Sequence, residues 1–374
     1  MLYLQTAYYD LLGVIRLIGI EENEKYFSLP IHSLSRDICL MIYQVNKEIL
    51  EDRYKLNPDI KKIRNKVKLN NGNKNKKIFS SILQQHIKKF GDDIDNIGFF
   101  LEDGKLRGSS IYITYLFNET TFFNNKNLSE ATSQFYTEVA KMLIVLLKDV
   151  VVASNGKLKW HIPEKIEYPD NMKYTSKDIH HLEFYKENEM VNVFFTRLLL
   201  IQNELSTCIW LEKGLNYKVP GFSDEKYILL RLVSIKIDEI MDSLINIRKF
   251  SPNEFVLLNN YSKTDLLRII DKYEKELKCE CANLRNMIHY NKIEQNFYDY
   301  LIDKLAINQN YVAELVEEIM IHYVEPLTNI LSDYLDIESK KSMTGFEKVI
   351  RRSKTIVSLK LRRINEGSIK NKSK

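Results

Sequence analysis

The feature that most constrains this chain is a series of four long amphipathic segments between residues 188 and 335. In the third, from Ser262 to Tyr290, apolar residues recur at steps of 4, 3, 4, 4, 3 and 4, which is the spacing of one buried helix face. These residues are Leu266, Ile270, Tyr273, Leu277, Cys281, Leu284 and Ile288. The other segments, 188–213, 223–250 and 310–335, have similar stripes. We therefore expect an antiparallel four-helix bundle over residues 188–339.

The first half of the chain has a more varied pattern. Helical periodicity covers residues 2–20, 37–56 and 129–150, the last with Ser129 as its expected N-cap. The whole chain has only 12 Gly and 7 Pro in 374 residues, which also favours long helices. We predict a mainly α-helical protein with an N-terminal, mostly helical domain of unknown role over residues 1–187.

A small β-hairpin is expected within this N-terminal domain, over residues 97–115. Two apolar runs, Ile97–Leu101 and Ser109–Tyr115, flank the dipeptide Asp103-Gly104. Asp-Gly favours a tight turn because both residues tolerate positive φ angles. The second run is expected to be a strand that packs on the core.

Cysteine and charge patterns predict a cytoplasmic protein. The four cysteines form no CxxC pair and have no histidine at a zinc-ligand spacing, so we expect reduced, buried thiols. The longest stretch without Asp, Glu, Lys or Arg is 11 residues, from Gly108 to Asn118, too short to cross a membrane. Nucleotide-binding, zinc-protease and serine-hydrolase signatures are absent from the sequence, and we predict no cofactor and no metal.

Two segments are strongly basic. Residues 57–90 contain ten Lys or Arg against Asp59 alone, and the tail 340–374 contains twelve against two Glu. A basic appendage on an acidic body is typical of a protein that binds a polyanion, although solvated tails have the same composition. The side chains that we expect to contact nucleic acid are Lys61, Lys62, Arg64, Lys66, Lys68, Lys76, Lys77, Arg351, Arg352, Arg362 and Arg363.

One group of residues in the third amphipathic segment is suited to chemistry. Arg285 and His289 lie four apart beside the apolar stripe, with Asn286 next to Arg285, so both side chains can face the same cleft. An Arg fork binds phosphate and a neutral imidazole moves a proton near pH 7. The structural alternative is a solvated Arg285 and a His289 that is favoured by the helix dipole.

The segment Asn283-Leu-Arg-Asn-Met-Ile-His-Tyr290 resembles the HEPN superfamily, whose mark is an Arg, a polar neighbour and a later His within a helical bundle. The family usually has four to six residues between Arg and His, and this chain has three. The resemblance implies that Arg285, Asn286 and His289 are catalytic residues. The function implied is a metal-independent endoribonuclease in which the RNA 2′-OH attacks the adjacent phosphate.

The resemblance also implies partners. HEPN ribonucleases occur in toxin, abortive-infection and antiviral-defence proteins, and two bundles pair around one cleft. We therefore expect RNA as the substrate, a homodimer formed through the bundle, and an antitoxin or sensor partner. The alternative is a non-catalytic HEPN-like module for dimerisation or nucleic-acid binding.

Overall fold

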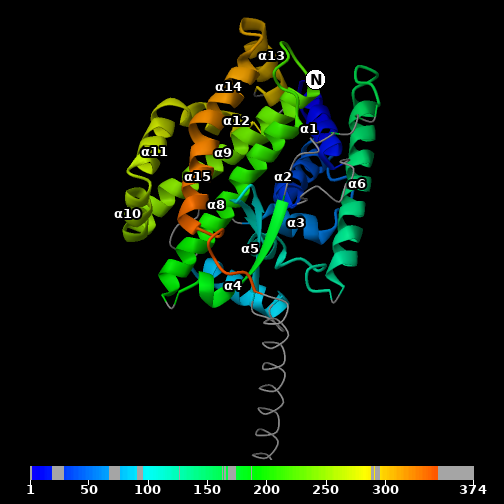
Figure 1. Cartoon of the computed structure of the whole chain (residues 1–374). Coiled ribbons are helices and arrows are strands. Elements are labelled where there is room, and N and C mark those ends of the chain that lie inside the picture. The colour runs from blue at the N-terminus through cyan, green and yellow to red at the C-terminus, as the bar shows by residue number, and fades with distance from the viewer. Residues whose placement is uncertain are drawn as a thin grey trace, which may run out of the picture.

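The computed structural model shows a mainly helical protein with a small antiparallel sheet (Figure 1). The residues it describes are 2–18, 29–66, 76–90, 96–125, 127–161, 163, 166, 174–186, 188–287, 290 and 295–343. All structural statements below concern these residues. The basic tail beyond Met343 lies outside them.

Helices dominate the first half of the chain. Their bounds are α1 Leu2–Ile18, α2 Leu29–Gln44, the π-helix η1 Val45–Ile49, α3 Pro58–Arg64, α4 Lys76–Phe90, α5 Ser110–Phe117, α6 Leu128–Ala153 and α7 His181–Phe184. The helix predicted over 2–20 is confirmed by α1 as far as Ile18, and residues 19–20 lie outside the described residues. The one predicted over 37–56 begins earlier, at Leu29, and ends earlier, at Ile49. Asn127, not Ser129, caps α6, and its side chain accepts a hydrogen bond from the Glu130 N–H.

The second half is also helical. Its elements are α8 Glu189–Gly214, α9 Asp224–Phe250, α10 Pro252–Tyr261, α11 Asp265–Glu276, α12 Lys278–Asn286, α13 Phe297–Ile307, α14 Tyr311–Ile319, the π-helix η3 Met320–Val324 and α15 Glu325–Leu335. The predicted helices over 188–213 and 223–250 are confirmed by α8 and α9. Ser223 caps α9 as expected, because its side chain accepts from the Lys226 N–H.

The sequence predicts a single helix from Ser262 to Tyr290, but the structure has two helices in this segment. α11 ends at Glu276 and α12 begins at Lys278, with Leu277 between them at φ −120° and ψ −21°. The apolar stripe gives no sign of this break, since Leu277 is buried at the break and Tyr273 and Cys281 are buried on either side of it. Periodicity reports which face is buried, and it does not report whether the backbone hydrogen bonds continue.

Residues 310–335 are helical, as predicted, with a π-helical turn inside the run. η3 directly precedes α15, whose first turn contains Pro326. Proline has no backbone N–H and its ring collides with the carbonyl four residues earlier. A wider turn just before Pro326 relieves both constraints, which explains why the regular α-helix is interrupted there.

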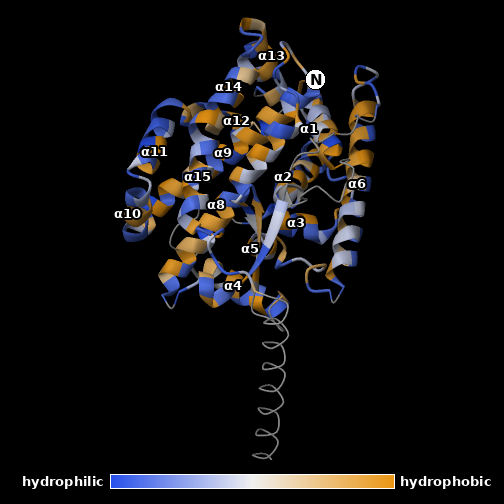
Figure 2. Ribbon diagram, in the orientation of Figure 1, coloured by the Kyte–Doolittle hydropathy of each residue, from blue (hydrophilic) through white to orange (hydrophobic). Residues whose placement is uncertain are grey.

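α8 and α9 form the centre of the bundle. Both are buried on almost every side, as expected for helices surrounded by other elements. In Figure 1 α10, α11, α14 and α15 lie on one side of this pair and α1, α2 and α6 on the other. Figure 2 shows that the outer helices, such as α11, carry hydrophilic as well as hydrophobic residues.

The N-terminal helices pack directly on the bundle. α1 contacts α6, α9 and α13, and α2 contacts α8. Gly13 of α1 allows a close approach, because a Cβ atom there would lie 2.6 Å from the Ile228 Cβ of α9. Buried residues from both halves belong to one hydrophobic core. The domain boundary at residue 187 therefore remains a prediction. The residues before and after it contribute to one shared core.

The sheet has the strand order β2-β1-β3 and is antiparallel throughout. Its strands are β1 Asn96–Glu102, β2 Lys105–Ser109 and β3 Tyr174–His180. Asp103 and Gly104 form the turn between β1 and β2 with φ angles of 49° and 77°, as the sequence predicts. The hairpin is therefore confirmed as far as Ser109.

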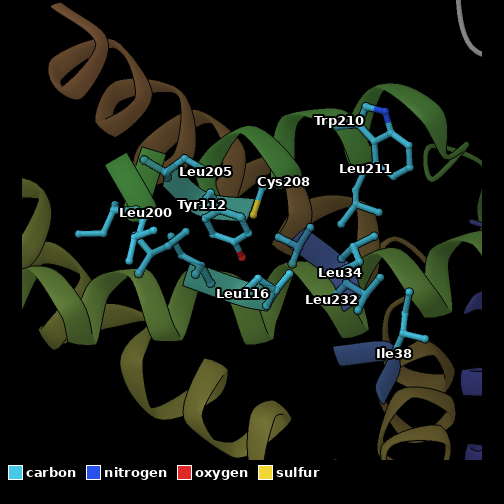
Figure 3. Packing of buried hydrophobic residues seen from close by; sticks show 14 of the residues in the cluster. Leu34, Ile38, Tyr112, Leu116, Leu200, Leu205, Cys208, Trp210, Leu211 and Leu232 are labelled. Atoms are coloured by element: carbon cyan, nitrogen blue, oxygen red, sulfur yellow. The ribbon is translucent and has the colours of Figure 1, made fainter. Parts of the chain in front are cut away.

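Beyond Ser109 the strand prediction is wrong, because residues 110–117 form α5. This run is nearly all apolar, and its residues are buried around the whole helix rather than on one face. Figure 3 shows Tyr112 and Leu116 packed among residues of α8 that include Leu200 and Cys208. A short apolar run fits a buried strand and a buried helix equally well in the sequence.

The described residues include no helix that is long and apolar enough to cross a membrane. Three of the four cysteines, Cys39, Cys208 and Cys281, are buried and unpaired, as predicted. Cys279 is exposed, which contradicts the expectation of four buried thiols. It lies on the outer face of α12, two residues from the buried Cys281, where a helix turns its side chains by about 200°.

Candidate functional site at the end of α12

α12 places Arg285 and Asn286 at its C-terminal end. Its buried face consists of Cys281 and Leu284, and it packs against α9. Arg285 follows Leu284 and is therefore at the edge of this contact, with 22% of its side chain exposed. Asn286, the last residue of the helix, is exposed. The helix thus presents an arginine and an amide together at the boundary between core and solvent.

Arg285 is held by two carboxylates of α9. Its Nη1 donates to Asp238 Oδ2 and lies 3.5 Å from Asp242 Oδ2. Asp238 and Asp242 are four residues apart and so face the same side of α9. Within the described part of the chain, the hydrogen bonds of the Arg285 guanidinium all use Nη1. The Nε and Nη2 edge therefore has N–H groups that can bind an added anion.

Asp238 is the buried member of this pair. It also accepts a hydrogen bond from the Tyr273 hydroxyl of α11, at 3.0 Å from Oδ1. Burial raises the pKa of Asp238, the charge of Arg285 lowers it, and the net result lies above its ordinary value. Burial and the nearby carboxylate also raise the pKa of Tyr273, so its hydroxyl remains a donor. Asp238 is thus held by Tyr273 through Oδ1, and its Oδ2 positions Arg285.

A second ion pair, fully buried, holds the backbone on both sides of Arg285. Arg231 of α9 pairs with Asp10 of α1, with Nε 3.3 Å from Oδ1. Its Nη1 and Nη2 donate to the backbone carbonyls of Leu284 and Met287, at 3.4 and 3.1 Å. A cation at the C-terminus of a helix satisfies carbonyls that have no partner within the helix and complements its dipole. The end of α12 is thereby attached to α1 and α9.

Asp10 also binds the tyrosine that closes the Arg-Asn-x-x-His-Tyr sequence. The Tyr290 hydroxyl donates to Asp10 Oδ2 at 2.9 Å, and the Tyr227 hydroxyl donates to Oδ1 at 2.9 Å. Burial and the charge of Asp10 raise the pKa of both tyrosines, which keeps both hydroxyls protonated. Met287 and Tyr290, on either side of the predicted catalytic histidine, are therefore both held by the same buried pair.

The structure describes two of the three predicted catalytic residues. Arg285 and Asn286 lie side by side in α12, as expected. His289 and its neighbour Ile288 lie outside the described residues. The partners of Arg285 come from α9 and are not apparent from the sequence of α12. Asp238 and Asp242 are 47 and 43 residues away, and only their spacing of four within an amphipathic helix could have indicated them.

Some of the predicted nucleic-acid contacts are on the surface. Lys61 and Arg64 of α3 lie over the ring of Tyr43, with the Arg64 guanidinium carbon 3.5 Å from the ring centroid. Lys62 pairs with Asp59 at 3.1 Å. Lys66 differs from the prediction, because it is buried with its ammonium on Asn118 and 3.3 Å from Glu119. Burial lowers the pKa of Lys66, and its side chain does not face a polyanion.

The side chains of the other predicted nucleic-acid contacts lie outside the part of the chain that the structure describes. Lys76 and Lys77 begin α4, but their side chains lie outside the description. The other residues outside it are Lys68, Arg351, Arg352, Arg362 and Arg363. Among the described residues, no three His, Cys, Asp or Glu side chains are grouped as metal ligands.

The comparisons with known proteins add no relative. Searches with protein-family models, among curated proteins and among solved structures gave no match.

Proposed function

We propose that this protein is a metal-independent endoribonuclease of the HEPN type, with Arg285, Asn286 and His289 as its catalytic residues. The observation that supports this proposal best is the placement of Arg285. It lies at the end of a bundle helix, is oriented through one nitrogen by Asp238 and Asp242, and has its other edge turned away from those carboxylates. A preorganised cation of this kind stabilises charge that develops on a phosphate.

The proposed reaction divides the chemistry among the three residues. Arg285 binds the scissile phosphate, and Asn286 donates a hydrogen bond to a phosphate or ribose oxygen. The 2′-oxygen forms a bond to phosphorus while the bond from phosphorus to the 5′-oxygen breaks. The 2′-hydroxyl loses its proton and the leaving 5′-oxygen gains one, and His289 acts as acid or base in this proton transfer. The products are a 2′,3′-cyclic phosphate and a 5′-hydroxyl.

The wider proposal retains the partners expected from the sequence. Two copies would pair through the bundle to form a homodimer, and RNA would be attracted by the basic segments 57–90 and 340–374, with a strong dependence on salt. The biological context would be a cytoplasmic toxin or antiphage effector that an antitoxin or sensor restrains.

Cleavage of labelled RNA by the full-length protein in excess EDTA tests this proposal. We expect cleavage with cyclic phosphate ends, and a loss of at least about 100-fold in rate for Arg285→Ala and for His289→Ala. Arg248→Ala is the matched arginine control, because Arg248 of α9 is also paired with two carboxylates on the surface. His322→Ala removes an exposed histidine of η3 and serves as the histidine control.

A non-catalytic nucleic-acid-binding or dimerisation module is the second candidate function. It is favoured by one observation, which is that two carboxylates already neutralise Arg285. If the folded, dimeric wild type leaves RNA intact at every concentration tested but binds it, the ribonuclease proposal is wrong and the module remains.

A further inference from the structure

α14, η3 and α15 follow one another along the outside of the bundle, where they pack on α8 and α9 (Figure 1). One side of this helical run is buried and the opposite side is exposed. Six exposed residues recur at steps of 3, 4, 4, 4 and 4, which keeps them on one face of the run. We call this the acidic face, and its residues are Glu314, Glu317, Ile321, Glu325, Asn329 and Asp333.

The charged residues of this part of the chain are all acidic. Residues 305–339 contain seven Asp or Glu and no Lys or Arg. Among the described residues, two surface lysines of other segments form ion pairs with the acidic face. Lys105 Nζ lies 2.7 Å from Asp333 Oδ1, and Lys218 Nζ lies 4.0 Å from Glu317 Oε1. Exposed pairs of this kind contribute little, so the face keeps a negative surplus.

The rest of the acidic face has no cation from the described part of the chain. Glu314 accepts a hydrogen bond from the Asn308 amide at 2.8 Å, and neither Glu314 nor Glu325 forms an ion pair there. Between them Ile321 is 55% exposed. A segment that carries both basic and apolar side chains can therefore neutralise the carboxylates and cover the isoleucine.

The basic tail starts close to the end of α15. After that helix the chain returns to the sheet, where the Lys177 ammonium of β3 donates to the carbonyls of Glu338 and Lys340. The Met343 N–H then donates to the Asp178 carbonyl at 2.7 Å. The chain is thus fixed on β3 within eight residues of Leu335, the last residue of α15.

The tail beyond this point is long enough to return along the acidic face. It has 31 residues, with ten Lys or Arg against two Glu and with apolar residues such as Ile350 and Ile356 between the charges. A segment of this length spans about 100 Å when extended and about 46 Å as a helix. The run from Tyr311 to Leu335 is about 37 Å long. Either conformation can therefore reach every carboxylate of the face.

We propose that the acidic face of α14 and α15 is the docking site for residues 344–374 of the same chain, and that a polyanion releases this tail by competing for its basic side chains. Opposite charges attract the two segments. The covalent connection also gives the tail an effective concentration in the millimolar range, which a separate basic protein would have to supply from solution. The connection is the reason for assigning the face to the tail of this chain.

Docking would regulate how the protein binds nucleic acid. The acidic face acts as an internal competitor that occupies the tail, so weak and non-specific binding of polyanions is reduced. That RNA is the polyanion in the cell rests on the proposed function, whereas the docking of the tail does not.

Carbodiimide crosslinking of the full-length protein at low concentration and low salt tests the docking. The reagent joins a lysine to a carboxylate that it contacts. We expect crosslinks from tail lysines such as Lys354 and Lys360 to Glu317 and Asp333, mapped by peptide mass spectrometry. High salt or added heparin should decrease them at least about 5-fold, because both weaken the attraction between tail and face. A mixture of ¹⁵N-labelled and unlabelled protein distinguishes links within one chain from links between two copies.

The double variant Glu314→Lys/Glu325→Lys reverses two charges of the face and leaves the crosslinked carboxylates in place. We expect at least about 5-fold fewer crosslinks to Glu317 and Asp333, since the tail is now repelled. The variant should also bind a fluorescent single-stranded RNA about 3- to 10-fold more tightly, because a larger fraction of tails is free.

Glu130→Lys/Glu138→Lys is the matched control, because it makes the same change in net charge on the exposed surface of α6. It should stay within about 2-fold of the wild type in both measurements, and thermal melts show that both double variants are folded. The proposal is overturned if the folded wild type gives no crosslinks from the tail to the face, or gives them between two copies only. Equal crosslinking in the two double variants, or crosslinks that persist in heparin, would also overturn it. A protein that does not cleave RNA still gives these crosslinks, so failure of the ribonuclease proposal is a separate result.

Discussion

Asp238 and Asp242 both contact Arg285, but they differ in burial and in distance. Asp238 has 2% of its side chain exposed, and Asp242 has 29% and lies 3.5 Å from Nη1. A buried carboxylate that accepts two hydrogen bonds defines the position of its partner better than a surface carboxylate does. Asp238 is therefore the residue that should position Arg285 for the proposed reaction.

This difference gives a test in which two conservative variants are compared. Asp238→Asn should lower kcat for RNA cleavage by about 10- to 100-fold, because a misplaced cation no longer meets the phosphate. Asp242→Asn should lower kcat by less than about 3-fold. Single-turnover kinetics on one RNA substrate measure both, and equal losses in the two variants would contradict a positioning role for Asp238.

His32 of α2 should make the stability of the fold sensitive to mild acid. Burial lowers the pKa of His32 to about 4, and its Nδ1 lies 2.7 Å from the Tyr136 hydroxyl. In the unfolded chain its pKa is about 6.5. The unfolded state thus takes up a proton that the folded state rejects, and stability falls as the pH decreases from about 6.5 to about 4.

Urea unfolding at a series of pH values measures this effect. The wild type should lose on the order of 3 kcal/mol over this range, and His32→Gln should lose much less. The His322→Gln control should behave like the wild type. Salt-bridged carboxylates such as Glu102, whose pKa lies below its ordinary value because Lys213 and Arg107 outweigh the effect of burial, lose their contribution only at lower pH, below about 4.3.

At the scale of elements, the contact between α1 and α9 depends on one glycine. An alanine in the middle of a helix usually stabilises it by up to about 1 kcal/mol relative to glycine. At position 13 the added methyl would lie 2.6 Å from Ile228 Cβ, a distance at which the two helices must separate. Packing therefore outweighs helix propensity at this position.

Gly13→Ala should accordingly destabilise the protein by about 1–3 kcal/mol. Urea unfolding compares it with Ser133→Ala on the exposed face of α6, which should change stability by less than about 0.5 kcal/mol. A Gly13→Ala variant more stable than the wild type would mean that α1 and α9 are not in close contact.

At the scale of the whole molecule, a buried charge network connects α2, α8 and α9. Lys236 is fully buried and its Nζ lies 2.6 Å from both Asp37 Oδ2 and Glu204 Oε2. Arg36 pairs with Glu239 in the same network. Burial alone would lower the pKa of Lys236, but the charges of Asp37 and Glu204 outweigh it and raise it. Each charge is thus compensated by partners from other helices.

Removal of one member of this network should be costly. Lys236→Met leaves Asp37 and Glu204 buried without their shared cation, and we expect a loss of about 3–5 kcal/mol. Arg248→Met, which breaks a surface ion pair, should lose less than about 1 kcal/mol. Chemical denaturation of both variants at pH 7 measures the difference, and similar losses would show that the network contributes no more than surface pairs do.

The sequence by itself determined the helical class, the bounds of α1, α8 and α9, and the turn at Asp103-Gly104. These features follow from periodicity, capping and φ preferences, which are properties of neighbouring residues. Only the tertiary structure decided that residues 110–117 are helical and that the stripe from Ser262 breaks at Leu277. In both cases the apolar pattern is compatible with either backbone, and the surrounding elements select one.

The surroundings of the predicted catalytic residues were also decided by the tertiary structure. The sequence places Arg285, Asn286 and His289 together, but the partners Asp238, Asp242, Asp10 and Arg231 come from helices up to 275 positions away in the chain. Local patterns determine which residues are buried, whereas the contacts between buried polar groups depend on how distant elements meet.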